Sequence, residues 1–127
     1  MLTNYEVFEK VKTHLLAQGV RSQIPGTRTC LYRGPGGLKC AVGALIEDEH
    51  FDAQFNNETV NDERVLDERV LDALLASGVN VKDENLILLL NELQLLHDFY
   101  APKFWDAKLK SLKEEYFAEG TTIANYS

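Results

Sequence analysis

The sequence predicts a mainly α fold, a helical bundle of about four principal helices with a short Gly-rich β-hairpin insert. Apolar residues recur at helical spacing over residues 4–18, 63–77 and 84–100, and a fourth such segment follows Pro102. A glycine-rich segment without this period lies between the first two. A chain of 127 residues, 45% of them hydrophobic, can form one core. We therefore expect a single globular domain over residues 1–119 and a flexible tail over 120–127.

The first helix has clear boundaries in the sequence. Thr3 and Glu6 form a capping-box pattern, and Gly19 is placed to end the helix in a left-handed conformation. We predict a helix over residues 4–18 whose buried stripe contains Val7, Val11 and Leu15.

The Gly-rich segment predicts the hairpin insert. Residues 30–33 and 38–40 flank the turn Gly34-Pro35-Gly36-Gly37, and residues 41–46 follow as a helical turn. Two-residue turns suffice for a hairpin, so this longer tip is expected to be exposed and to take part in recognition.

The pentapeptide ERVLD occurs twice in succession, over residues 63–67 and 68–72. Five residues advance a helix by about 140°, so the duplication predicts one helix with a broad face, ended by Gly78, and not a solenoid. Asp67 would point into that face, which indicates either a late N-cap or half of a buried pair.

The segment 84–100, capped by Asp83, is apolar nearly all round and is predicted to be the central helix. Glu92 must be paired or reach solvent, and His97 is interpreted as a hydrogen-bonded core histidine. The last helix follows Pro102 and runs to about Ala118, with a seam of Trp105, Leu109, Leu112 and Tyr116. The predicted core contains Leu90, Leu93, Trp105 and Leu109.

The charge is unevenly distributed. The net charge of −7 divides into +4 over residues 1–46 and −11 over residues 47–127. This balance disfavours direct nucleic-acid binding and directs any anionic ligand to residues 21–39. No stretch is apolar enough for a membrane span, and the first residues do not resemble a signal peptide, so we expect a cytoplasmic protein without membrane contact.

The basic flank of the hairpin is the candidate partner- or anion-binding site: Arg28, Arg33, Gly36, Gly37 and Lys39. Glu92 and His97 are secondary candidates. In the structural alternative, Arg33 pairs with Glu92 or Asp67 and holds the hairpin to the helices. A nucleotide-binding loop is disfavoured because Lys39 is not followed by Ser or Thr.

Metal and thiol chemistry have weaker signals. Cys30, Cys40 and His50 follow one another at intervals of ten residues, which is wider than the close ligand pairs of zinc sites. His97 would be the fourth ligand. We expect no metal and no cofactor. Free thiols are favoured. Two alternatives remain: a reversible disulfide between the two cysteines, and a cysteine nucleophile with His14, His50 or His97 as its general base.

Residues 30–46, CLYRGPGGLKCAVGALI, are followed by acidic residues and by Phe51. This motif resembles a family of small proteins encoded by tailed phages and prophages, and Leu93–Asp98 with Trp105 resembles the C-terminal half of those proteins. The family has no established biochemical function, so the resemblance implies a setting and not an activity, in which the compartment would be the host-cell cytoplasm.

Three function classes follow. The favoured one is a non-enzymatic protein that binds a host protein, for host takeover or inhibition of a defence system. A more specific version of this class is a nucleic-acid mimic, in which the acidic residues 47–72 would imitate the charge of a nucleic acid. The second is sequestration of a small anionic, nucleotide-like ligand at the hairpin. The third is a small enzyme or redox protein built on Cys30 or Cys40.

Overall fold

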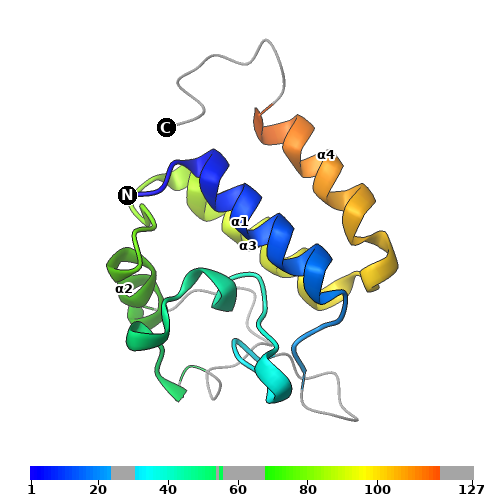
Figure 1. The fold of residues 1–127 in the computed structure, drawn as a ribbon. Helices are drawn as coiled ribbons and strands as arrows, with labels where there is room; N and C mark the ends of the chain where they lie inside the picture. Colours follow the sequence, from blue (N-terminus) through cyan, green and yellow to red (C-terminus); the bar gives the residue numbers. More distant parts are fainter. Residues whose placement is uncertain (24–30, 54, 56–67, 118–127) are drawn as a thin grey trace.

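The computed structural model describes residues 1–23, 31–53, 55 and 68–117 of the chain. It is mainly helical, as predicted (Figure 1). The α-helices are α1 (Asn4–Gln18), α2 (Glu68–Ala76), α3 (Glu84–Phe99) and α4 (Trp105–Phe117). Short 3-10 turns are η1 (Pro35–Gly37), η2 (Gly43–Leu45), η3 (Asp48–His50) and η5 (Pro102–Phe104). Within the described ranges no helix has the length and apolar character that a membrane crossing requires.

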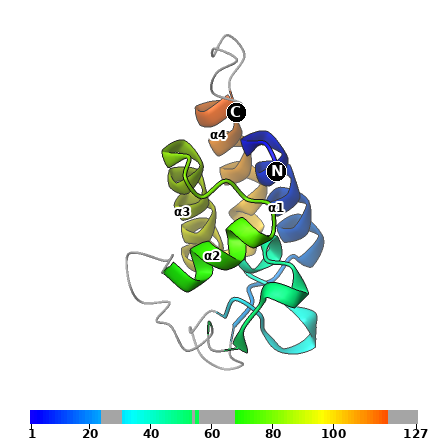
Figure 2. The ribbon, with the colours of Figure 1, turned by 90° about the vertical axis from the view of Figure 1, so that its left-hand side faces the viewer.

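Helices α1, α3 and α4 form the centre of the molecule. α1 and α3 run side by side in the same direction, and α4 returns against them in the opposite direction (Figure 1). The start of α1 is joined to the residues before α3 by hydrogen bonds from Leu2 N to Gly78 O (2.8 Å) and from Asn4 Nδ2 to Asp83 Oδ2 (3.1 Å). α2 crosses one side of these helices (Figure 2).

Helix α1 has the predicted boundaries because its ends are satisfied locally. Glu6 N donates to Thr3 Oγ1 (3.1 Å), and Thr3 N donates to Glu6 Oε1 (2.9 Å), which completes the capping box. Gly19 ends the helix with φ 69° and donates its N–H to the Leu15 carbonyl. The buried stripe contains Val7, Phe8, Val11 and Leu15.

Helix α3 begins where predicted, with Asp83 accepting the amides of Asn85 (2.9 Å) and Leu86 (3.4 Å). One face is buried against α1 and α4, but the opposite face is open to solvent at Leu88, Leu95 and Phe99. Helix α3 packs between neighbours as a central helix should, but part of its apolar circumference is not buried.

The predicted core is confirmed, since Leu90, Leu93, Trp105 and Leu109 are all buried. The α4 seam differs at its end: Phe117 is buried there, and Tyr116 is only half-buried.

Replacing Leu93 by Ala should lower the free energy of unfolding by about 2 to 5 kcal/mol, because the lost methyl groups leave a cavity between packed helices. Urea denaturation followed by circular dichroism measures this loss. Exposed Leu88 on the same helix is the control, and its replacement by Ala should cost under about 1 kcal/mol. Equal losses at both positions would contradict the assigned burial.

The predicted β-hairpin is not seen as paired strands among the described residues. In the described part of the insert, one isolated antiparallel bridge joins Arg33 and Lys39, and η1 forms the tip between them. The predicted helical turn is the shorter η2, which packs on α1. Arg28, Cys30, Asp67, the first ERVLD copy and the predicted tail lie outside the described residues. The second ERVLD copy begins α2.

Candidate functional site

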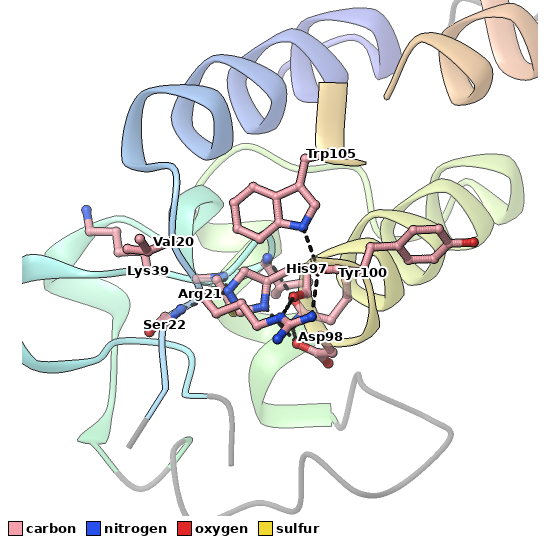
Figure 3. A network of polar contacts seen from close by, with 12 residues as sticks. Val20, Arg21, Ser22, Lys39, His97, Asp98, Tyr100 and Trp105 are labelled. Carbon is pink, nitrogen blue, oxygen red and sulfur yellow. Dashed lines mark hydrogen bonds and ion pairs between the residues drawn. The ribbon is translucent and has the colours of Figure 1, made fainter. Parts of the chain in front are cut away.

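His97 is fully buried in the last turn of α3, and both of its ring nitrogens are hydrogen-bonded (Figure 3). The backbone N–H of Ser22 lies 3.0 Å from Nε2. A backbone amide can only donate, so Nε2 is the acceptor and the ring proton resides on Nδ1. Nδ1 donates to Asp98 Oδ1 at 2.8 Å, and the Trp105 ring stacks on the imidazole at 5.7 Å. This arrangement confirms the prediction of a hydrogen-bonded core histidine.

The hydrogen bonds continue from His97 through the side of α3. Asp98 Oδ1 also accepts from Gln94 Nε2 (2.9 Å), and Gln94 Oε1 accepts from the Val42 backbone N–H (3.0 Å). The side chains of Gln94, His97 and Asp98 are almost completely buried. Burial of these polar groups is tolerable because they pair with one another and with two backbone amides. The network therefore attaches residues 20–23 and 40–43 to α3.

A second set of contacts closes the C-terminal end of α3. Arg21 donates from Nε to the His97 carbonyl (3.0 Å) and from Nη2 to the Tyr100 carbonyl (2.7 Å). Trp105 Nε1 donates to the same Tyr100 oxygen at 3.0 Å. A cation is favourable at a helix C-terminus, where carbonyl groups lack helical partners. Arg21 therefore stabilises the fold at a position that the sequence placed in the anion-binding region.

Cys40 is unsuited to nucleophilic chemistry. Its side chain is buried, and this burial raises the pKa of the thiol to about 12. The N–H of Gly43 donates to Sγ at 3.2 Å. A thiol of this kind keeps its proton at neutral pH, and His97 has no free nitrogen to remove it. A Cys40–His97 catalytic pair is therefore inconsistent with the geometry.

The buried thiol predicts a pH dependence of stability. Below about pH 9 the folded and unfolded chains both keep the Cys40 proton; above it the unfolded thiol ionises while the folded thiol does so only near pH 12. Stability should therefore fall by about 1 kcal/mol for each pH unit above 9. Urea denaturation between pH 7 and 10.5 tests this, with Cys40→Ala as the control that lacks the titrating group. Identical pH profiles for both proteins would contradict the assignment.

The side chain of Arg33, a predicted binding residue, is engaged within the chain. It donates from Nη1 to Asp48 Oδ1 and from Nη2 to the Ile46 carbonyl, both at 2.6 Å. Its guanidinium lies 4.5 Å from the centre of the Phe51 ring. The structural alternative named Glu92 or Asp67 on the helices; the carboxylate that Arg33 meets is instead Asp48 of η3, and Asp67 lies outside the described residues. The guanidinium thus stabilises the segment after η2.

The other hairpin residues occupy different environments. Gly36 and Gly37 are exposed in η1, both with positive φ. Lys39 is half-buried, and its backbone is held by α1: Gln18 donates to Lys39 O (2.9 Å) and accepts from Lys39 N (2.9 Å). His14 Nε2 lies 3.0 Å from the same carbonyl oxygen. The structure brings Arg33 and Lys39 together as a backbone bridge, and it places Glu92 and His97 on a separate element, α3.

His50 lies in a small acidic cluster with Glu47 and Glu49. The two glutamates are exposed, and nothing else at the cluster points to a bound ion. The metal set considered from the sequence is not assembled by the described residues, because Cys40 is buried and His97 is fully hydrogen-bonded elsewhere.

The outer face of α3 is the feature that sequence reasoning missed. Leu88, Leu95 and Phe99 recur at intervals of seven and four residues, and their exposed fractions are 57%, 40% and 71%. Intervals of three, four and seven place residues on one side of a helix. Glu84 and Glu92 fall on the same side. The position of Glu92 within an apolar stripe could have indicated that this side of the helix is exposed, because burying an unpaired carboxylate in a core is costly.

Comparisons with protein-family models, with curated proteins and with solved structures found no match to this chain.

Proposed function

We propose that the protein acts without catalysis by binding another protein through the outer face of α3. The observation that carries the proposal is the exposure of Leu88, Leu95 and Phe99 on a helix whose other side already forms a complete core. These side chains do not contribute to that core, and large exposed apolar residues grouped on one face are typical of interaction surfaces. The geometry of Cys40 and His97 disfavours the enzymatic alternative.

The charge around this face indicates the chemistry of the partner. Glu84 and Glu92 lie among the apolar residues, and the whole chain carries a net charge of −7. A partner segment with an apolar face and flanking Lys or Arg residues would match both properties. An amphipathic helix is the expected form, because ridges of residues at such intervals pack into the grooves of another helix.

A second copy of the chain is a poorer occupant. Pairing two outer faces of α3 about a twofold axis would bring Glu84 and Glu92 of both copies into one interface. Carboxylates brought together in a partly desolvated interface repel one another. We therefore infer a different protein as the partner. In the phage setting implied by the sequence motif, that protein would belong to the host, and its capture would serve host takeover or inhibition of a defence system.

The test is site-specific photo-crosslinking in bacterial cells. A benzophenone amino acid is placed at Leu95 or, as a matched control, at Leu16 of α1; both side chains are 40% exposed. We expect a heteromeric adduct only from position 95. Mass spectrometry should locate the crosslink in an apolar segment that contains Lys or Arg. Adducts between copies of this chain, or the same adducts from both positions, would contradict the proposal.

Two further variants separate this surface from the hairpin. The double variant Leu95→Ser, Phe99→Ser should no longer bind the partner identified by crosslinking in a pull-down without crosslinking. Lys39→Ala should retain it, because the α1 contacts of Lys39 are made by backbone atoms. The reverse result would place the binding site at the Gly-rich hairpin, as the sequence alone favoured.

A further inference from the structure

A cavity of about 310 Å³ opens at the opposite end of α3 from His97. It lies among the first turn of α1, the first turns of α3 and the last turn of α4, and the starts of α1 and α3 lie side by side there (Figure 1). The lining residues are Asn4, Asn85, Leu88, Leu89, Glu115, Tyr116 and Phe117. Because Leu88 belongs to both, the cavity is continuous with the outer face of α3.

Asn4 lies in the wall of this cavity and carries a buried acceptor without a hydrogen-bond partner. Its side chain is only 4% exposed, and Nδ2 donates to Asp83 Oδ2 at 3.1 Å. This bond determines the orientation of the amide, and Oδ1 is then buried without a hydrogen-bond partner. A buried, unsatisfied acceptor costs about 1 to 3 kcal/mol, and an N–H group of a ligand would remove this cost once the side chain shifts its oxygen to the cavity surface.

The other polar groups of the cavity are also suited to a donor. Glu115 supplies a carboxylate, and burial, with Glu92 and Glu115 nearby, raises the pKa of the Tyr116 hydroxyl, which therefore stays neutral. The partial positive charges at the N-termini of α1 and α3 are neutralised by the carboxylates of Glu6 and Asp83, respectively. The C-terminus of α4, which carries partial negative charge, points toward the cavity. The lining set contains no Lys or Arg; Lys113 lies instead over the Tyr5 ring.

The size of the cavity limits its occupant. Small-molecule sites span about 300 to 1,000 Å³, so this cavity is at the lower end and fits one long side chain better than a nucleotide or a cofactor. Leu88, Leu89 and Phe117 supply apolar walls along which methylene groups can lie. Hydrogen-bond acceptors beside apolar walls suit a ligand group with a cationic end and an aliphatic stem.

We propose that this cavity receives an arginine side chain of the partner protein, an inference that rests on the proposed function and names the anchor of that interaction. The guanidinium would donate to the Glu115 carboxylate, with its stem against Leu88 and Leu89. A small shift of the Asn4 side chain would bring Oδ1 within reach of a second N–H group. Arginine fits better than lysine because its planar group carries five donors and is more weakly hydrated. The neighbouring apolar stripe would hold the rest of the partner segment.

The probe for this site is Nα-acetyl-arginine N-methylamide, titrated into the ¹⁵N-labelled full chain at low salt. The neutral citrulline analogue is the matched control compound. We expect saturable shifts of the Asn4, Leu88 and Tyr116 amides with a Kd of the order of 1 to 10 mM, and at least about tenfold weaker binding of citrulline. Random shifts without saturation, or equal binding of the two compounds, would overturn the proposal.

Charge variants on α4 complete the test. Glu115→Gln should weaken binding of the arginine probe by about fivefold or more, because it removes the carboxylate from the cavity. Glu114→Gln removes an exposed carboxylate from the adjacent position outside the lining and should leave the Kd unchanged. Equal Kd values for Glu115→Gln and the unmodified chain would overturn the assignment.

The experiments distinguish failure of the proposed binding face of α3 from failure of the proposed arginine site. Partner crosslinks at position 95 without arginine-probe binding would overturn only the anchor assignment. Probe binding without any crosslink would overturn the proposed function and, with it, the attribution of the arginine to a partner.

Discussion

The Gly43→Ala variant is expected to lose about 4 kcal/mol or more of unfolding free energy, or to fail to fold. An added Cβ at Gly43 would lie 2.0 Å from the Tyr32 carbonyl oxygen and 2.8 Å from its carbon. These are backbone atoms, so no side-chain rotation can relieve the overlap. The same oxygen accepts the Cys40 N–H at 3.2 Å, so moving Tyr32 would also disturb that hydrogen bond. Urea denaturation followed by circular dichroism measures the loss.

Gly36→Ala is the matched control for Gly43→Ala. Gly36 has φ 71° and nothing within 4 Å of an added Cβ, so only the cost of a left-handed alanine applies, about 1 to 2 kcal/mol. A loss at Gly43 no greater than the loss at Gly36 would show that η2 does not approach Tyr32 as closely as the structure places it.

Replacing His97 by Ala should lower the unfolding free energy by about 4 to 6 kcal/mol. The variant removes the donor to Asp98, which is 5% exposed, and leaves the Ser22 amide without an acceptor. It also leaves a void beside the Trp105 ring. These terms are coupled, so the total is smaller than the sum of their separate costs. Denaturation in urea is again the measurement, with His50→Ala as the control histidine at under about 1 kcal/mol.

A spectroscopic measurement keeps this prediction testable if His97→Ala does not fold. Long-range ¹H–¹⁵N correlation spectra of the unmodified protein at pH 7.5 should show His97 as the neutral tautomer with its proton on Nδ1. A proton on Nε2 would contradict the hydrogen bond from Ser22.

The sequence alone determined the features that depend on neighbours a few residues away. The Thr3–Glu6 capping box, the Gly19 stop and the Asp83 cap are contacts within a helical turn, so a short pattern specifies them. Burial of Leu93 and Trp105 was predictable as well, because apolar periodicity states which residues can share a face.

Contacts between distant segments were decided only by the tertiary structure. His97 and Ser22 are 75 residues apart, and Arg33 could have met any of several carboxylates before Asp48 was brought beside it. The apolar residues of α3 likewise cover nearly the whole circumference in the sequence, and packing against α1 and α4 on one side alone left Leu88, Leu95 and Phe99 exposed. Hydrophobic burial is non-directional, so the composition of a helix states how much can be buried but not which side its neighbours will cover.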